Sequence, residues 1–264
     1  MPKKIFFTPG PSALYYTVEE HIKSALKAQI PEISHRSSAF KSTYEEAESN
    51  LRTLLSLPEN FNIAFLASAT EIWERLIQNL VSKHSLHLVN GAFSKRFGEI
   101  ATELGRKTTI VESKEGSIAT ANDIPVGEEP ELVAITQNET STGVAYPQEE
   151  ITALRDRFPN AIFAMDVVSS IPTAPVDYNL VDSIYFSVQK CFGLPAGLGV
   201  WVYNDKCLEK ANSLNEAHQS IGSYHSLLKL HTSGLKHQTP ETPNVLNIYL
   251  LAKVAGDMLD KGLD

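Results

Sequence analysis

Two charged residues each follow a short apolar run, and together they could carry chemistry. Lys190 comes after the run Ser183-Ile-Tyr-Phe-Ser-Val-Gln189, and Asp166 closes the run from 161 to 165. Lysine is rarely fully buried without a reason. An amine in a desolvated place has a lowered pKa and can attack a carbonyl to form a Schiff base. A carboxylate on a neighbouring strand could hold a protonated ring nitrogen.

A covalent amine anchor and a carboxylate for a ring nitrogen are what pyridoxal phosphate needs in an enzyme. Taken alone, Lys190 is more often a surface lysine after a strand, and Asp166 is more often a turn residue. The turn after Lys190 favours the chemical interpretation. It contains Pro195, Gly197 and Gly199, and glycine allows the backbone to approach a ligand closely.

Two strand-to-helix junctions could complete a ligand site. The segment Ala67-Ser-Ala69-Thr70 leads into a helical pattern, where free N–H groups and the helix dipole can bind an anion. The alternative is a simple Ser/Thr cap, and Glu71 would have to point away from an anion. Phe93 opens another helical pattern and could stack on a ring, or could be a core residue.

Two polar segments have both a functional and an ordinary interpretation. Asn138-Glu-Thr140-Ser-Thr-Gly143 follows an apolar run and is either a turn or a loop that lines a ligand. His35 and Arg36 could bind an anionic substrate, or could be a solvated basic pair.

These candidates need a scaffold, and the chain alternates short apolar runs with helical stretches. This pattern predicts an α/β fold with three layers, in which helices cover both faces of a mostly parallel sheet. Ligands of such sheets bind beyond the carboxyl ends of the strands. We expect an irregular segment over 1–15 and one large domain over 16–264. The expected strands are 62–66, 86–89, 108–111, 132–136, 161–165, 183–188 and 199–203, and the expected helices are 18–28, 39–55, 70–82, 93–105, 148–158, 205–215, 220–230 and 243–259.

Composition narrows the classes of function. The 264 residues are 42% hydrophobic and carry a net charge of -8, which disfavours nucleic acid and anionic membranes as partners. Two cysteines, Cys191 and Cys207, make neither a disulfide framework nor a zinc cluster. We expect no metal site, no signal peptide and no membrane span, and therefore a cytoplasmic protein.

Taken in order, these motifs resemble the class V aminotransferases of the fold type I pyridoxal phosphate enzymes, most closely the phosphoserine branch. The resemblance spans nearly the whole chain. Its motifs are Phe7-Thr-Pro-Gly-Pro-Ser12, Ser34-His-Arg-Ser37 with Phe40, Asn138-Glu-Thr140, Asp166 with Ser169-Ser170, Gln189-Lys190 with Pro195-Ala-Gly197, and Thr239-Pro-Glu-Thr242.

The resemblance implies a role for each residue that would contact the cofactor. Lys190 would form the Schiff base and then shuttle a proton. Asp166 would pair with the pyridinium nitrogen, and Thr140 would bind the phenolic oxygen. Phe93 would cover the ring. The phosphate would be held by Ala69 and Thr70, with Gln189 alongside.

The resemblance also implies a homodimer with shared active sites. Thr239, with Gln238, would reach the phosphate of the partner subunit's cofactor. His35 and Arg36 would bind the anionic groups of small amino-acid and keto-acid substrates. The implied reaction is transamination between phosphoserine and 2-oxoglutarate in serine biosynthesis.

Several departures from the family pattern keep alternatives open. The phosphate loop lacks the usual glycines and the arginine frequent at position 70, Phe93 replaces a tryptophan, and the turn after Lys190 is one residue longer. The resemblance implies a C-terminal small domain, and we expect this domain to be missing from the 264 residues. The alternatives are another class V transaminase, of the alanine–glyoxylate or serine–pyruvate type, or a truncated, non-catalytic protein of this fold.

Overall fold

A seven-stranded sheet forms the middle layer of the computed structural model, which describes residues 6–262. The strand order is β1-β9-β8-β7-β4-β2-β3. Only β9 runs against its neighbours, so the sheet is mostly parallel, as predicted. The strands are β1 (Phe61–Leu66), β2 (His84–Val89), β3 (Lys107–Glu112), β4 (Leu132–Thr136), β7 (Ile162–Asp166), β8 (Ser183–Ser187) and β9 (Gly199–Asn204). A separate small hairpin pairs β5 (Asn138–Glu139) with β6 (Val144–Ala145).

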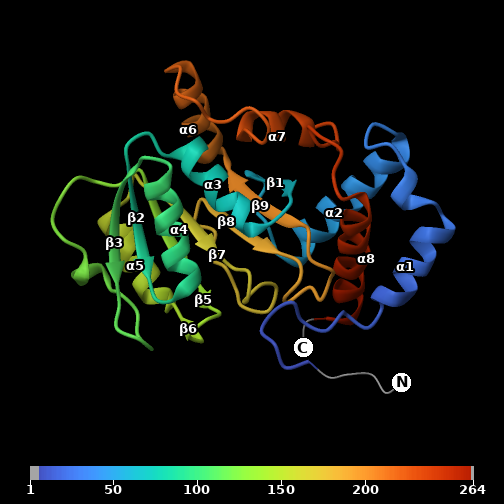
Figure 1. Ribbon diagram of the computed structural model, residues 1–264, viewed down its shortest axis with the longest axis horizontal. Coiled ribbons are helices and arrows are strands. Elements are labelled where there is room, and N and C mark those ends of the chain that lie inside the picture. The colour runs from blue at the N-terminus through green and yellow to red at the C-terminus, as the bar shows by residue number, and fades with distance from the viewer. Residues whose placement is uncertain (1–5, 263–264) are drawn as a thin grey trace.

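Helices enclose the sheet (Figure 1). Neighbouring helices α3 and α4 pack on strands of the sheet, while α2 and α8 pack against each other at one end. The helices are α1 (Val18–Lys27), α2 (Ser38–Leu54), α3 (Ala69–Leu80), α4 (Ala92–Glu103), α5 (Gln148–Arg157), α6 (Asp205–Glu216), α7 (Leu227–Gly234) and α8 (Val245–Lys261), with short 3₁₀ turns at Ile30–Glu32 and Ala121–Asp123.

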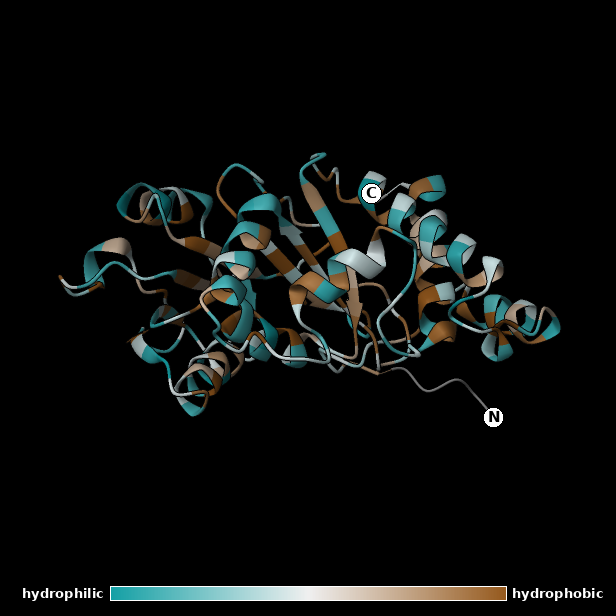
Figure 2. Cartoon of the chain, turned by 90° about the horizontal axis from the view of Figure 1, so that it is seen from above, coloured by the Kyte–Doolittle hydropathy of each residue, from teal (hydrophilic) through white to brown (hydrophobic). Residues whose placement is uncertain are grey.

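The five inner strands of the sheet are buried along their whole length, although β2 contains the polar residues His84, Ser85 and His87. Every residue of β2, β4, β7, β8 and β9 is buried, as expected for strands covered on both faces. Figure 2 shows these strands mostly brown between helices striped brown and teal. Among the described residues, no helix is both long and apolar enough to span a membrane.

The register of the central strands places polar residues at one edge. Thr136 at the end of β4 pairs with Asp166 at the end of β7, and Asp166 pairs with Tyr185 of β8. The carboxyl ends of these parallel strands therefore carry the aspartate and lead directly into the segment of Lys190.

One predicted helix is misplaced. We expected helix over 220–230, but helix α7 begins only at Leu227. Gly222 has a φ of +84°, which right-handed helix does not allow, so the chain turns there before the helix starts. The division into segments 1–15 and 16–264 stays a prediction. Residues 1–5 and 263–264 of those ranges lie outside the described residues, and 6–15 form no helix or strand.

Candidate active site

A cavity at the carboxyl edge of the sheet gathers most of the predicted site residues. It lies between the starts of helices α3 and α4, the loop after β4, and the ends of β7 and β8. The predicted residues that line it are Ala69, Thr70, Phe93, Thr140, Asp166, Gln189 and Lys190.

The amine of Lys190 is held inside this cavity. Its Nζ donates a hydrogen bond to Thr140 Oγ1 at 2.6 Å and lies 4.6 Å from the centre of the Phe93 ring. Burial lowers the pKa of Lys190, and the nearby charge of Asp166 partly opposes that shift. A lysine with a lowered pKa carries a neutral, nucleophilic amine more often than a surface lysine does.

The irregular N-terminal segment crosses the turn that carries Lys190. Ser12 donates from its backbone N–H to Gln189 O at 2.8 Å and from its hydroxyl to Lys190 O at 2.6 Å. Gly10 lies against the lysine stem, where an added Cβ would be 2.8 Å from Lys190 Cγ. Gly193, with a φ of +57°, accepts the N–H of Tyr15 at 2.8 Å. The segment fixes the backbone from which the lysine projects.

Asp166 is a buried carboxylate, only 5% exposed. Its Oδ1 accepts the backbone N–H of Val168 at 2.9 Å. Burial raises the pKa of Asp166 to about 7, although the Val168 N–H and the charge of Lys190 act in the opposite direction. A cation placed against this carboxylate would therefore be bound strongly, because it would compensate a charge that burial disfavours.

The hydroxyl of Thr140 is positioned by a small polar network. Thr140 Oγ1 lies 3.0 Å from Ser169 Oγ. Ser169 in turn donates to Asn138 O at 2.7 Å and accepts from Asn138 Nδ2 at 3.0 Å. Two motifs of the sequence, one after β4 and one after β7, thus meet and hold the partner of the Lys190 amine.

Glu139 occupies the start of helix α4, and sequence patterns indicated no role of its own for this residue. This carboxylate is fully buried. It accepts from the backbone N–H and hydroxyl of Ser94 at 3.0 and 2.9 Å, and from those of Ser141 at 3.1 and 2.7 Å. Burial alone would raise the pKa of Glu139, but these hydrogen bonds outweigh it and the pKa is lowered.

Glu139 therefore fixes two neighbouring parts of the site. It holds the first turn of α4, which presents Phe93, and the loop that presents Thr140. Gly91 is needed at the junction because an added Cβ would lie 2.4 Å from Glu139 Cγ. Two signals could have indicated this contact: a buried carboxylate just after a strand, and a serine in the first turn of a helix.

The start of helix α3 is different, because part of it is open to the cavity. Ser68 caps the helix by accepting the N–H of Glu71 at 3.1 Å, and Ala69 N donates to Ser187 Oγ at 2.7 Å. Within residues 6–262, the backbone N–H and hydroxyl of Thr70 and the side-chain amide of Gln189 make no hydrogen bond. These donors at a helix start fit an anionic group such as a phosphate.

Three predicted site residues lie outside the cavity and cluster together. Arg36 donates to Gln238 Oε1 at 2.8 Å and to Thr239 O at 3.0 Å. His35 Nδ1 lies 3.3 Å from Thr242 Oγ1. Thr239 is buried and donates to Glu241 O at 2.7 Å. In a single chain these residues bind each other, and their roles toward substrate and cofactor stay predictions.

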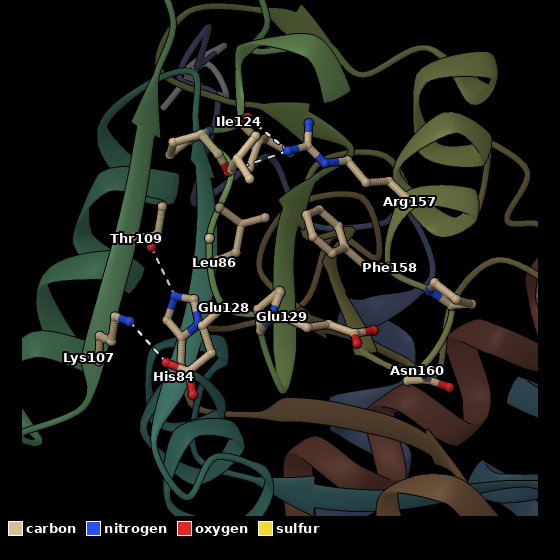
Figure 3. A pocket seen from close by; sticks show the side chains of 15 residues that line it. His84, Leu86, Lys107, Thr109, Ile124, Glu128, Glu129, Arg157, Phe158 and Asn160 are labelled. Carbon is tan, nitrogen blue, oxygen red and sulfur yellow. Dashed lines mark hydrogen bonds and ion pairs between the residues drawn. The ribbon is translucent and has the colours of Figure 1, made fainter.

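A larger cavity of about 510 Å³ lies at the opposite edge of the sheet, where β2 and β3 begin (Figure 3). His84 contacts Thr109 there at 2.9 Å, and Lys107 pairs with Glu128 at 3.0 Å. The predicted site residues are absent from its lining. Volume alone is thus a poor guide to the site in this fold, and the carboxyl edge holds the reactive groups.

This fold and site define a class of protein, and the comparison with known families agrees. The aminotransferase class-V family model matches residues 6–263. The chain belongs to the class V aminotransferases.

The relatives and solved structures found include phosphoserine aminotransferases and an aminotransferase of another specificity. Phosphoserine aminotransferase of Rhodococcus opacus is 31% identical over 87% of this chain and 60% of its own length. The crystal structure of a phosphoserine aminotransferase from Cytophaga hutchinsonii is 52% identical with a TM-score of 0.96, and covers 98% of this chain and 72% of that one. An aspartate aminotransferase from Thermus thermophilus, 24% identical with a TM-score of 0.81 over 98% of this chain and 71% of that one, shares the fold. The chain spans about 60% of the length of the curated relatives it matches.

Proposed function

We propose that the chain is the cofactor-binding part of a pyridoxal phosphate-dependent aminotransferase that acts on phosphoserine and 2-oxoglutarate. The observation that carries the proposal is the arrangement around Lys190. A lysine amine of lowered pKa lies at a strand end, 2.6 Å from a threonine hydroxyl, in one cavity with a buried aspartate. The family and the identity to phosphoserine aminotransferases support it.

The residues present fit this cofactor. Lys190 would hold it covalently at Nζ, Asp166 would face the ring nitrogen, and Thr140 would bind the phenolic oxygen. The aromatic ring of Phe93 would cover one face. The donors of Thr70, at the start of α3, and of Gln189, just after β8, would bind the phosphate. When bound, the cofactor supplies an electron sink that allows a proton to leave the substrate Cα.

The protein's own groups then prepare and move protons. Burial keeps the Lys190 amine ready to accept a proton at Nζ and to donate it to a nearby carbon. The Thr140 hydroxyl fixes the direction of that amine. Asp166 has a raised pKa in the free protein. It becomes a stable carboxylate once a cationic nitrogen faces it, and so it keeps that nitrogen protonated.

The substrate assignment and the assembly belong to the same proposal. Arg36 and His35 would bind anionic substrate groups, and Thr239 would reach the cofactor phosphate of a neighbouring subunit in a homodimer. The cluster they form around the 238–242 segment supports a shared position for these residues. We place the enzyme in the cytoplasm, as a member of serine biosynthesis.

Borohydride trapping tests the cofactor assignment directly. The 264-residue chain, mixed with pyridoxal phosphate and reduced, should carry the cofactor on the peptide that contains Lys190 when analysed by mass spectrometry. Lys190→Ala should carry none, while the matched control Lys210→Ala, at a lysine paired with Glu131 at 2.6 Å, should label as wild type does. Labelling spread over other lysines would overturn the proposal.

Substrate choice needs a second measurement. Conversion of the bound cofactor to its amino form is followed by absorbance in single turnover with phosphoserine, alanine and serine. We expect phosphoserine to react fastest. Reaction with alanine but not phosphoserine would replace the assignment with another class V transaminase, and binding without any conversion would mean that this length of chain is not catalytic.

A further inference from the structure

A buried histidine next to the anion site lies between two carboxylates. His225 is 2% exposed. Its Nδ1 is 2.5 Å from Glu71 Oε1 and its Nε2 is 2.8 Å from Glu241 Oε2, the latter with the geometry of an ion pair rather than a straight hydrogen bond. The ring of Tyr224 stacks on the imidazole at 3.9 Å. Because each ring nitrogen faces a carboxylate oxygen, the protonated imidazole is the form that fits.

His225 joins two segments that are far apart in the sequence. Glu71 belongs to the first turn of α3, and its other oxygen accepts the N–H of Ala67 at 2.9 Å. Glu241 belongs to the segment that contains Thr239, whose hydroxyl donates to Glu241 O at 2.7 Å. The imidazole therefore ties the phosphate end of the cavity to the segment predicted to face a neighbouring subunit.

The position of Glu71 poses an electrostatic problem that His225 solves. Glu71 follows Thr70, whose N–H and hydroxyl make no hydrogen bond among residues 6–262. A carboxylate near a helix start tends to take such donors for itself, as Glu139 does at α4. A free Glu71 would both compete with a bound phosphate for the donors and repel it.

We propose that His225 is a positioning residue that keeps the Glu71 carboxylate away from the start of α3, and so keeps that helix start open to the phosphate of the cofactor. The inference rests on the proposed function, because it assumes that a cofactor phosphate binds there. It assigns to His225 an action through Glu71, without contact to the cofactor. The role is specific to the phosphate and does not extend to the ring or the aldehyde.

The test compares pyridoxal phosphate with pyridoxal, which lacks the phosphate. Dissociation constants are measured by equilibrium dialysis for wild type and His225→Phe, which keeps a ring to stack on Tyr224. We expect His225→Phe to weaken pyridoxal phosphate roughly tenfold or more, a change of about 1.4 kcal/mol or more, and to change pyridoxal less than about twofold. Equal weakening of both compounds, or no weakening, would overturn the inference.

A second variant separates the charge of Glu71 from simple packing. In Glu71→Gln/His225→Phe the competing carboxylate is gone, so the affinity for pyridoxal phosphate should return to within a few-fold of wild type. A double variant as weak as the single one would mean that His225 acts by packing alone. If His225→Phe does not fold by circular dichroism, His225→Gln takes its place with the same criteria.

The two proposals fail in different ways. Wild-type protein that does not attach pyridoxal phosphate at Lys190 would contradict the proposed function. Wild-type protein that attaches it, with a His225→Phe variant of equal affinity, would contradict only the role of His225.

Discussion

Helices α3 and α4 begin at the same cavity, yet their first turns are used in opposite ways. At α4, the carboxylate of Glu139 occupies the N–H groups and the Ser94 hydroxyl. At α3, the carboxylate of Glu71 is turned to His225 and Ala67, and the donors of Thr70 make no hydrogen bond within the described part of the chain. One helix start is anchored by the protein, and the other opens into the cavity.

The difference shows that a helix start does not by itself define an anion site. A carboxylate at a helix start contributes about 0.3–1 kcal/mol, and up to about 2 kcal/mol when partly buried. Any acidic side chain within reach will therefore fill it unless another partner binds that side chain more strongly. The position of the nearest carboxylate decides whether the start of a helix anchors the fold or binds a ligand.

Removing the anchor of α4 should have the largest effect on stability. Glu139→Ala leaves the Ser94 and Ser141 donors without their buried acceptor, and we expect the free energy of unfolding in urea to fall by about 4 kcal/mol. The control is Glu149→Ala, at an exposed position in the first turn of α5, which should change it by less than about 0.5 kcal/mol. A small effect at Glu139 would mean that α4 does not depend on this carboxylate.

Asp166 is another acidic residue at this cavity; it is buried, and within the described residues no helix start stabilises its carboxylate. Its pKa is raised from 3.8 to about 7. The ionised form is disfavoured in the folded protein, so stability is lost as the pH rises from about 4 to about 7 and stays low above that. Asp166→Asn should remove this loss and be more stable than wild type, without cofactor, by about 4 kcal/mol above neutral pH. The free energy of unfolding in urea is measured against pH for both proteins. If it depends on pH in the same way in both, this prediction is wrong.

The ion pairs that hold Glu71 should show the opposite dependence on pH. Burial lowers the pKa of His225, but the contacts with Glu241 and Glu71 outweigh it and raise the pKa from 6.5 to about 9. Stability from these pairs is complete below pH 6.5 and is lost as the pH rises through 9. Among the described residues, the titratable groups of Tyr224, Arg75, His35 and Tyr44 also interact with one or both of these glutamates.

The measurement is the difference in unfolding free energy between wild type and His225→Gln. We expect it to shrink by about 2 kcal/mol between neutral pH and about pH 10. The imidazole of His225, followed by NMR, should titrate above the range of an exposed histidine. If the imidazole of His225 titrates in the range of an exposed histidine, the two carboxylates do not hold the ring as an imidazolium.

The cap of α3 should give the smallest effect. Ser68→Ala removes the acceptor for the N–H of Glu71, and we expect a loss of about 1 kcal/mol in urea unfolding. Ser213→Ala, at an exposed position of α6, is the control and should change little. Because the free donors of Thr70 are not involved, cofactor affinity should change less than it does in His225→Phe.

Local sequence patterns predicted the functional residues that lie at the ends of strands. Lys190 and Asp166 follow apolar runs, so both their burial and their shared edge could be expected. The predictions for Lys190 and Asp166 needed only the period of the pattern and the rule for carboxyl ends of parallel strands. For Thr140 and Phe93 the residues alone left two interpretations open, and the family resemblance favoured the site. The structure brings both residues to the cavity, and Glu71 points to His225.

Contacts between distant segments could not be predicted in this way. Glu139 lies 45 positions from Ser94, and Arg36 lies 202 positions from Gln238. His225 meets Glu71 across 154 positions and was assigned to a helix that begins only after it. Such pairs depend on how the layers pack, and a single sequence carries no periodic signal for that.

The hydrogen bonds of Ser12 with the lysine turn have a consequence for synthesis on the ribosome. The two residues of the Ser12–Lys190 bond are 178 positions apart. At about 5–20 residues per second, the early segment waits roughly 10–35 s before its partner is made. The backbone that aims the lysine is thus completed only after Lys190 has been made, and the nascent chain has no finished reactive centre before that point.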